Sequence, residues 1–188
     1  HLQLDAGART VFLADEAMSL DVGAVGKGYA VELAAEAAEA RGLDSALLNI
    51  GGNLRAIGEK ANGEGVWTVG VENPWGNDPT YIQTLALPDG YSLIVSGDYQ
   101  RYFEYEGVRY SHLIDLTTGY PAQYCSSVAI LAPDGSGGTG DALSTALFCL
   151  PEETGRRVLE HQPGFAALWM YPDDTTHQTD SWTGQAAQ

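Results

Sequence analysis

The sequence predicts an α+β fold in which a mainly antiparallel sheet has a few helices packed on it. Short strand-like runs follow one another through the middle of the chain, separated by Gly and Pro. One long stretch rich in Ala and Glu has the composition of a helix, and two shorter helical stretches adjoin each other between residues 141 and 161. Runs of strands with helices between them are typical of α+β proteins.

The 188 residues are most simply one domain, which is long enough to bury a substantial core. We expect this domain to cover residues 1–172. Residues 173–188 are mostly polar and are expected to form a frayed tail.

The first helix is expected over residues 27–41. This stretch is rich in residues that favour a helix, and it ends at Gly42, a residue type that commonly terminates one. A second helix is expected over residues 141–150, where apolar residues recur at helical spacing. A third should follow over residues 151–161, since Pro151 suits a first turn.

The expected strands are short apolar or alternating runs bounded by turn residues. The stretch from Tyr102 to Asp115 predicts a hairpin that turns at Gly107. The other expected strands cover residues 9–13, 45–50, 67–71, 81–87, 91–97, 126–131 and 165–171.

Composition excludes several classes of function. The chain has 25 acidic against 9 basic side chains and a net charge of −16, so it would repel the phosphates of a nucleic acid. No stretch is as long and apolar as a membrane span. The histidines and cysteines lack the spacing of a zinc site, and Cys125 and Cys149 are expected to be small buried side chains.

The turn before the first helix combines glycines with one lysine in "DVGAVGKGYA", residues 21–30. A phosphate-binding P-loop needs Gly five positions before its final Gly and Ser or Thr directly after its Lys. Asp21 and Gly28 stand at those two positions, so the P-loop is excluded. Another ligand has to explain an acid and a lysine at this turn.

Asp141 and Thr145 lie four residues apart and would share one face of a helix, just after a glycine-rich run. A carboxylate, a hydroxyl and a backbone carbonyl are hard oxygen ligands of the kind that Mg²⁺ accepts. For the pair taken alone, the commoner explanation is structural: Asp141 caps the helix and Thr145 bonds to its own turn.

His112 and Asp115 lie at the mouth of a strand, before a Thr-Gly turn. A histidine in such a loop can act as a general base or hold a phosphate. The alternative is a histidine that is only hydrogen-bonded within the structure, and spacing does not decide between them. The turn at Gly51 and Gly52 is also open to two explanations, the close approach of a flat ligand or a tight strand exit.

Taken together and in order, these stretches resemble the ApbE family, the FAD:protein FMN transferases. The resemblance covers residues 8–171 and is carried by "DVGAVGKGYAVE", "ALLNIGGNLRAIG", "VSGDYQRYFEYEGVRYSHLIDLTTGYPA", "SSVAIL" and "GDALSTALF". The corresponding family patterns are D-L-G-G-I-A-K-G-Y-A-x-D, N-I-G-G-D, S-G-x-Y…H-I-x-D-P-x-T-G-x-P and A-D-A-L-x-T-A. The chain departs from them at Glu32, Asn53 and Leu116, where the family usually has Asp, Asp and Pro.

The resemblance implies a T-fold-like architecture and an activity. Such enzymes bind FAD with Mg²⁺ and transfer FMN to a Ser or Thr hydroxyl in the flavinylation motif of an acceptor flavoprotein, releasing AMP. Two other activities stay open, hydrolysis of FAD to FMN and AMP with water as acceptor, and flavin binding without catalysis.

The resemblance also implies roles for individual residues. Asp21, Lys27, Ile114 and Asp115 fall where the family contacts FAD. The implied metal ligands are the backbone carbonyl of Ala24 and the side chains of Asp141 and Thr145. His112 matches a histidine near the FAD diphosphate and is the implied general base toward the acceptor hydroxyl.

Two further expectations follow from the family. Its members carry a long N-terminal portion before the D-x-G-x-x-x-K-G stretch, so this chain is expected to be either the C-terminal part of the family fold or a reduced version of it. The expected location is extracytoplasmic, at the bacterial periplasm or cell surface, with a lipoprotein anchor on the full-length protein.

Overall fold

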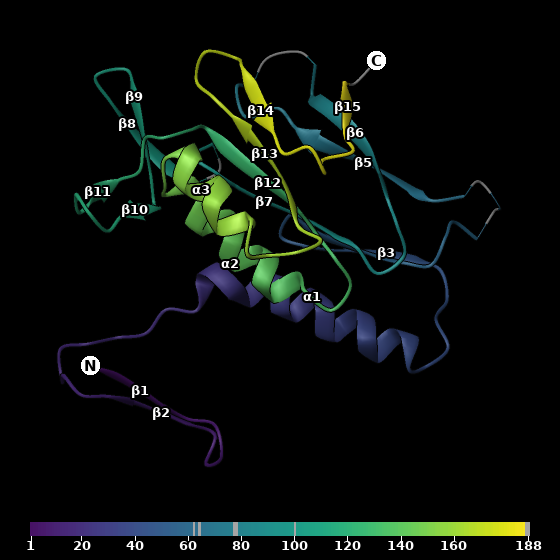
Figure 1. Ribbon diagram of the computed structural model, residues 1–188, viewed down its shortest axis with the longest axis horizontal. Coiled ribbons are helices and arrows are strands. Elements are labelled where there is room, and N and C mark those ends of the chain that lie inside the picture. The colour runs from purple at the N-terminus through teal and green to yellow at the C-terminus, as the bar shows by residue number, and fades with distance from the viewer. Residues whose placement is uncertain (62, 64, 77–78, 100, 187–188) are drawn as a thin grey trace.

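The computed structural model describes residues 1–61, 63, 65–76, 79–99 and 101–186. Its central sheet is built from β3 (Ala46–Ile50), β4 (Asn53–Ile57), β7 (Ser92–Gly97), β12 (Ser127–Ala132), β13 (Ala166–Met170) and β14 (Thr176–Gln178). These six strands are antiparallel and lie in the order β14-β13-β12-β7-β4-β3. Helices cover one face of this sheet, and a smaller sheet lies on the other face (Figure 1). The predicted α+β class is confirmed.

Strand β12 contributes side chains to the apolar core on both faces of the central sheet. All of its residues are buried. Val128 and Ile130 pack in the apolar cluster under the helices, whereas Ala129 and Leu131 pack in the cluster shared with the smaller sheet. Successive side chains of a strand point to opposite faces, so this apolar run builds a core on each side of the sheet.

The smaller sheet consists of β5 (Trp67–Glu72), β6 (Tyr81–Leu87) and β15 (Gln185–Ala186), in the order β15-β6-β5. The frayed tail predicted for residues 173–188 is therefore wrong, because β14 pairs with β13 and β15 pairs with β6. Between these two strands, Trp182 is only 5% exposed and packs in the cluster between the sheets. Burial of this one large aromatic side chain holds an otherwise polar segment in place.

The helices are α1 (Gly23–Glu39), α2 (Gly137–Phe148) and α3 (Glu152–Leu159). Both α1 and α2 begin four residues before their predicted starts. The prediction left these first turns out because they contain glycines, which disfavour a helix. A tertiary contact explains the difference. A Cβ at Gly137 would lie 2.8 Å from the carbonyl oxygen of Gly28, so the two helices meet where only glycine fits.

The C-terminal end of α1 is closed by Gly42, close to where the sequence predicts it. Gly42 has φ +87°, and its N–H donates to the carbonyl of Glu39. The N–H of Leu43 donates to the carbonyl of Ala38. Such a left-handed glycine satisfies carbonyls that the end of a helix leaves without partners.

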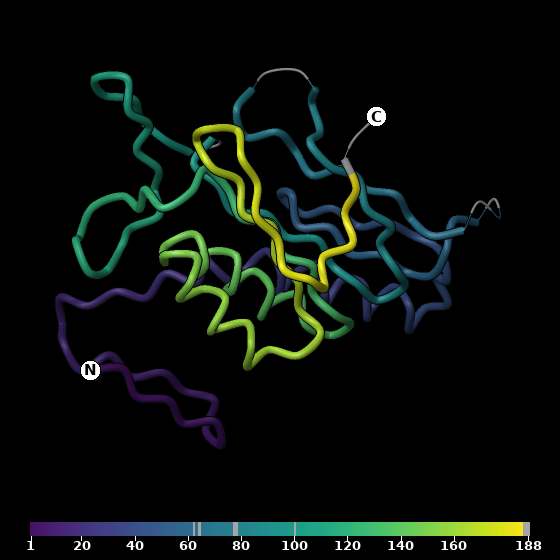
Figure 2. The backbone as a smooth tube through the Cα atoms, turned by 45° about the horizontal axis from the view of Figure 1, so that its top comes forward, coloured from purple at the N-terminus to yellow at the C-terminus, as the bar shows by residue number. Residues whose placement is uncertain are grey.

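The remaining strands form hairpins. β1 (Leu2–Asp5) pairs with β2 (Thr10–Leu13), β8 (Tyr102–Tyr105) with β9 (Val108–Ser111), and β10 (Ile114–Asp115) with β11 (Tyr120–Pro121). They stand away from the layered body (Figure 2). The predicted hairpin turning at Gly107 is confirmed for β8 and β9, but residues 114–115 belong to the next hairpin.

Both cysteines are free. Cys125 is buried under the helices, and this burial raises the pKa of its thiol. Cys149 is half-buried at the end of α2, and burial raises the pKa of its thiol as well. Within the described ranges, no helix has the length and apolar character needed to cross a membrane.

Candidate functional site

Helices α1 and α2 are in direct backbone contact. A Cβ at Gly28 would lie 2.2 Å from the carbonyl oxygen of Gly137 and 2.7 Å from the Cβ of Asp141. Any side chain at Gly28 would therefore force the helices apart. This contact joins two motifs that lie 113 positions apart in the sequence.

Asp141 is completely buried at this contact and has two partners from α1. Its Oδ2 accepts the backbone N–H of Gly28 at 2.8 Å, and its Oδ1 lies 3.1 Å from Lys27 Nζ. The alternative in which Asp141 caps its own helix is wrong, since α2 begins at Gly137 and Asp141 binds the neighbouring helix. The fold thus makes an ion pair from two residues that the sequence presents in separate motifs.

The backbone carbonyl of Ala24 lies in the first turn of α1. In an α-helix, the N–H of residue 28 points at the carbonyl of residue 24. Asp141 accepts the same N–H, one helical turn after Ala24. The resemblance implies that both groups are metal ligands, and Asp141 contacts α1 within one turn of Ala24.

Asp21 lies just before α1 and orders the entry into the helix. Its Oδ1 accepts the N–H of Gly23 at 2.7 Å. A Cβ at Gly23 would lie 2.9 Å from the same oxygen, so this local bond favours glycine there. Asp21 is exposed at the positively polarised end of α1.

Thr145 lies one turn after Asp141, and its hydroxyl meets the end of β7. Thr145 Oγ1 lies 3.3 Å from Ser96 Oγ, which in turn lies 2.8 Å from Ser144 Oγ. Ser144 Oγ donates to the backbone carbonyl of Asp141 at 2.9 Å. The partner of Thr145 is therefore a serine of the sheet and not its own helical turn. Sequence reasoning missed both serines; the only signal was the "SG" that ends a predicted strand.

His112 follows β9 and is exposed. Its backbone N–H donates to the carbonyl of Arg101 at 3.2 Å, and its Nδ1 lies 3.3 Å from the same oxygen. Since a carbonyl only accepts, Nδ1 is the donor in this contact, and in the neutral ring Nε2 is then an acceptor. Across the described ranges, no hydrogen bond joins His112 to Lys27 or Asp141, so it belongs to a separate loop.

The loop after His112 is built around Asp115. Asp115 accepts the backbone N–H of Thr117 at 2.8 Å and the hydroxyl of Tyr124 at 3.0 Å. The bond from Thr117 holds the pKa of the Asp115 carboxyl below its ordinary value. Asp115 therefore shapes the Thr-Gly turn, while its neighbours Ile114 and Leu116 are 42% and 94% exposed.

A buried ion pair joins the sheet to the two helices of the site. Arg55 on β4 is 1% exposed, and its guanidinium lies 3.0 Å from Glu32 and 2.7 Å from Asp134. Glu32 also accepts the N–H of Gly137 at 3.1 Å, at the N-terminal end of α2 where a negative charge is favoured. Asn53, two residues before Arg55, is completely buried, and neither of its amide atoms has a hydrogen bond.

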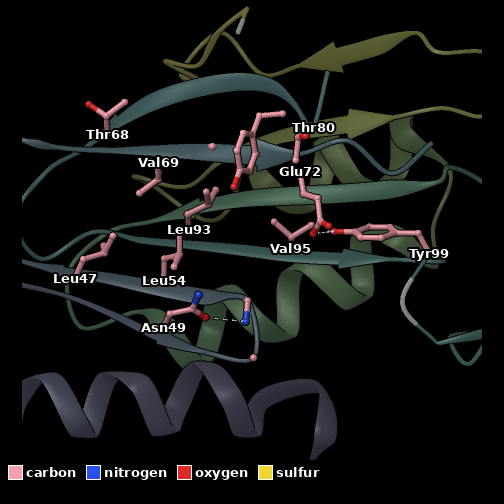
Figure 3. Close-up of a pocket in the computed structure, with 14 residues that line it drawn as sticks. Leu47, Asn49, Leu54, Thr68, Val69, Glu72, Thr80, Leu93, Val95 and Tyr99 are labelled. Carbon is pink, nitrogen blue, oxygen red and sulfur yellow. Dashed lines mark hydrogen bonds between the residues drawn. The ribbon is translucent and has the colours of Figure 1, made fainter. Parts of the chain in front are cut away.

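A cavity of about 430 Å³ opens between the two sheets, beside the turn at Gly51 and Gly52. The side chains that line it are drawn in Figure 3: Leu47, Leu54, Val69, Leu93 and Val95 are apolar, and Asn49, Thr68, Glu72, Thr80, Tyr81 and Tyr99 carry polar groups. A Cβ at Gly51 would lie 3.2 Å from Lys27 Cδ, so the cavity adjoins the entry into α1.

The oxygen groups at the helix contact fit a divalent cation by their chemistry. The carboxylate of Asp141 has more lone pairs than Lys27 and Gly28 use, and Thr145 supplies a neutral oxygen. Mg²⁺ takes one or two protein carboxylates and completes its shell with waters and ligand phosphates. In the part of the chain that the structure describes, no three His, Cys, Asp or Glu side chains group to hold a metal.

This arrangement of an acidic, a basic and a hydroxyl side chain beside a helix N-terminus defines a candidate site for an anionic ligand and a cation. The model of the ApbE family matches residues 1–169. The chain belongs to the ApbE family.

Known relatives agree with this assignment. The FAD:protein FMN transferase of Treponema pallidum is 40% identical in a match 172 residues long, and the match covers 87% of this chain and 47% of the relative. That of Klebsiella pneumoniae is 33% identical over 168 residues, 89% of this chain and 50% of the relative. The crystal structure of the ApbE protein from Thermotoga maritima superposes with a TM-score of 0.82 at 34% identity, covering 96% of this chain and 57% of that one. The chain thus spans about half the length of the curated relatives it matches.

Proposed function

We propose that this chain forms part of an FAD:protein FMN transferase, which moves FMN from FAD to a Ser or Thr hydroxyl of an acceptor protein and releases AMP. The names of its relatives support the proposal. The observation that carries it is the buried carboxylate of Asp141, which contacts Lys27 and Gly28 near the start of α1. A carboxylate that can bind a cation and an ammonium that can bind an anion thus lie together near one helix N-terminus, which supports the proposal.

In the proposed site, Asp141, Thr145 and the carbonyl of Ala24 hold Mg²⁺. When bound, Mg²⁺ neutralises diphosphate charge and polarises the phosphorus that is attacked. The side chain of Lys27 is 41% exposed, so it can turn from Asp141 to a phosphate oxygen. Asp21 lies at the same helix entry and is proposed as a further contact to FAD.

His112 is proposed as the general base. Its free Nε2 takes the proton of the acceptor hydroxyl while that oxygen bonds to the FMN phosphorus and the bond from phosphorus to the AMP oxygen breaks. Its exposed loop, which includes Ile114 and is shaped by Asp115, is open to a protein substrate.

The cavity beside Gly51 is proposed to receive a flat ring of FAD. Its apolar walls and few polar side chains are the combination that ligand pockets usually offer to ring systems. Lys27 lies next to the same turn, since a Cβ at Gly51 would lie 3.2 Å from its Cδ, and this supports a site that continues from the phosphates toward a ring.

The proposal is tested by incubating the chain with FAD, Mg²⁺ and a peptide that bears a Thr-containing acceptor motif. Mass spectrometry should find FMN added to the peptide, and EDTA should prevent this addition. Free FMN and AMP without an adduct would replace the transferase by an FAD hydrolase. Binding of FAD with neither product would leave a flavin-binding protein.

A His112→Ala variant separates catalysis from binding. Loss of a general base slows a reaction by about 10² to 10⁴-fold, so transfer should slow by at least 100-fold while the Kd for FAD is unchanged. The rate of FMN transfer is measured in a time course of quenched reactions, and the Kd is measured by titration with FAD. An increase in Kd at an unchanged rate of transfer would make His112 a ligand contact and not a base.

A further inference from the structure

We propose that Ser96 is a positioning residue that orients the hydroxyl of Thr145 for cation binding. This inference rests on the proposed function, because it needs the cation site at Asp141 and Thr145. Ser96 lies on β7, the strand that passes under α2 in Figure 1, and it is half-buried. Ser96 is not one of the proposed cation ligands.

The hydrogen bonds between these hydroxyls run in one direction only. The backbone carbonyl of Asp141 can only accept, so the single proton of Ser144 is committed to it. Ser144 Oγ must then accept from Ser96, at 2.8 Å. With its own proton given to Ser144, Ser96 Oγ must accept from Thr145, at 3.3 Å.

Thr145 therefore donates its one proton to Ser96, and both lone pairs of its Oγ1 remain free. A cation needs a lone pair and is repelled by a hydroxyl proton, so this direction prepares Thr145 as a ligand. Without Ser96, the hydroxyl of Thr145 would lose the acceptor that fixes the direction of its proton. The proton could then point into the proposed site, where it would compete with a cation for Oγ1.

Binding of Mn²⁺, measured by the loss of its free-ion EPR signal, tests this without any enzymatic assay. Mn²⁺ prefers the same oxygen ligands as Mg²⁺. A Ser96→Ala variant should raise the Kd for Mn²⁺ by about tenfold, as removal of a residue that orients a metal ligand commonly does. The matched control is Ser127→Ala, since Ser127 Oγ donates to the backbone carbonyl of Ser96 at 3.1 Å and stays outside the chain of hydroxyls. The control should bind Mn²⁺ as the wild type does.

A double-mutant cycle with Thr145→Ala separates positioning from a general structural effect. If Ser96 acts through Thr145, Ser96→Ala should change the Kd little once Thr145 is absent. An equal loss in both backgrounds, or an unchanged Kd in the single variant, would overturn the inference and leave the proposed function standing. Absence of Mn²⁺ binding by the wild type would overturn the cation site and the inference together. Normal binding of Mn²⁺ without FMN transfer would count against the proposed function alone.

Discussion

The surroundings of Asp141 decide which substitution tests its role. Its carboxylate is completely buried and accepts the N–H of Gly28. An alanine would remove this buried hydrogen bond to a charged acceptor, at a cost of about 1.5–3 kcal/mol. Loss of activity in such a variant could then come from the missing cation ligand or from the less stable fold. Asparagine keeps the size and one acceptor oxygen and removes only the charge.

For Asp141→Asn we expect loss of cation-dependent turnover by more than the roughly 100-fold that a supporting contact contributes. The neutral amide still accepts from Gly28, so the melting temperature should fall by only a few degrees. Turnover with FAD at increasing Mg²⁺ and a thermal melt followed by circular dichroism measure both. Full Mg²⁺-dependent activity would remove Asp141 from the cation site.

Single residues also show what the sequence could and could not predict about the site. The family resemblance pointed to Lys27, Asp141 and Thr145; the fold pairs Lys27 with Asp141, and Thr145 follows one turn later on α2. It did not indicate Ser96, because the hydroxyl contact depends on which strand passes under α2. His112 lies in another loop, so the structure supplies two clusters where the motifs suggested one.

Glycines set the distance between α1 and α2. Gly28 faces Gly137 and Asp141 across the helix contact, whereas a Cβ at Gly26, one position before Lys27, would meet nothing within 4 Å. Both glycines disfavour a helix by the same intrinsic amount. They therefore form a matched pair in which only one residue keeps the helices together.

We expect Gly28→Ala to destabilise the chain by about 1–3 kcal/mol or more, since overpacking a tight contact costs that amount. It should also weaken binding of Mn²⁺, because α2 carries Asp141 away from α1. Gly26→Ala should instead stabilise the chain by about 0.5–1 kcal/mol. Denaturant unfolding of both variants measures this difference. Equal effects of the two substitutions would mean that the helices can separate without cost.

The helices also show why element boundaries were harder to predict than the elements. The starts of α1 and α2 lie in glycine-containing turns that propensity alone assigns to loops. Their helical state comes from contact with each other, which the local sequence does not contain. The strands of the central sheet were easier, since apolar runs such as β12 and β13 are buried on both faces. Only β4 and β14 of that sheet were missed.

At the scale of the whole molecule, the C-terminal segment is joined to the helical layer by a cluster of side chains around Glu152. Glu152 at the start of α3 accepts from His177 Nδ1 on β14 at 2.7 Å, from the hydroxyl of Tyr171, and from Arg156 at 2.7 Å. Burial of the Glu152 carboxyl acts to raise its pKa, but the bonds from these three residues lower the pKa to about 2.

The Glu152 cluster makes the stability of the chain depend on acidic pH. A carboxyl whose pKa is lower in the folded state stabilises the fold above its unfolded value, near 4.5, and this contribution is lost as the pH falls toward 2. Over that range the free energy of unfolding should fall less steeply in Glu152→Gln than in the wild type. Urea unfolding at a series of pH values measures the slopes.

Glu153→Gln is the control for this experiment, because the Glu153 side chain is 86% exposed and its ion pair, with Arg157, lies on the surface. It should keep the slope of the wild type. A wild-type slope in Glu152→Gln would assign the acid dependence to other carboxylates whose pKa values are lowered, such as Asp115 and Asp173.

The pairing of β14 and β15 has a consequence for the order in which the protein can fold as it is made. One short segment supplies an edge strand to each sheet, and Trp182 between them fills the core that the sheets share. A ribosome releases the chain from its N-terminus, so both sheets stay incomplete until residues 176–186 have emerged. The helix contact at Gly28 can form earlier, because α2 precedes this segment. The candidate site can therefore assemble before the two sheets that support it are closed.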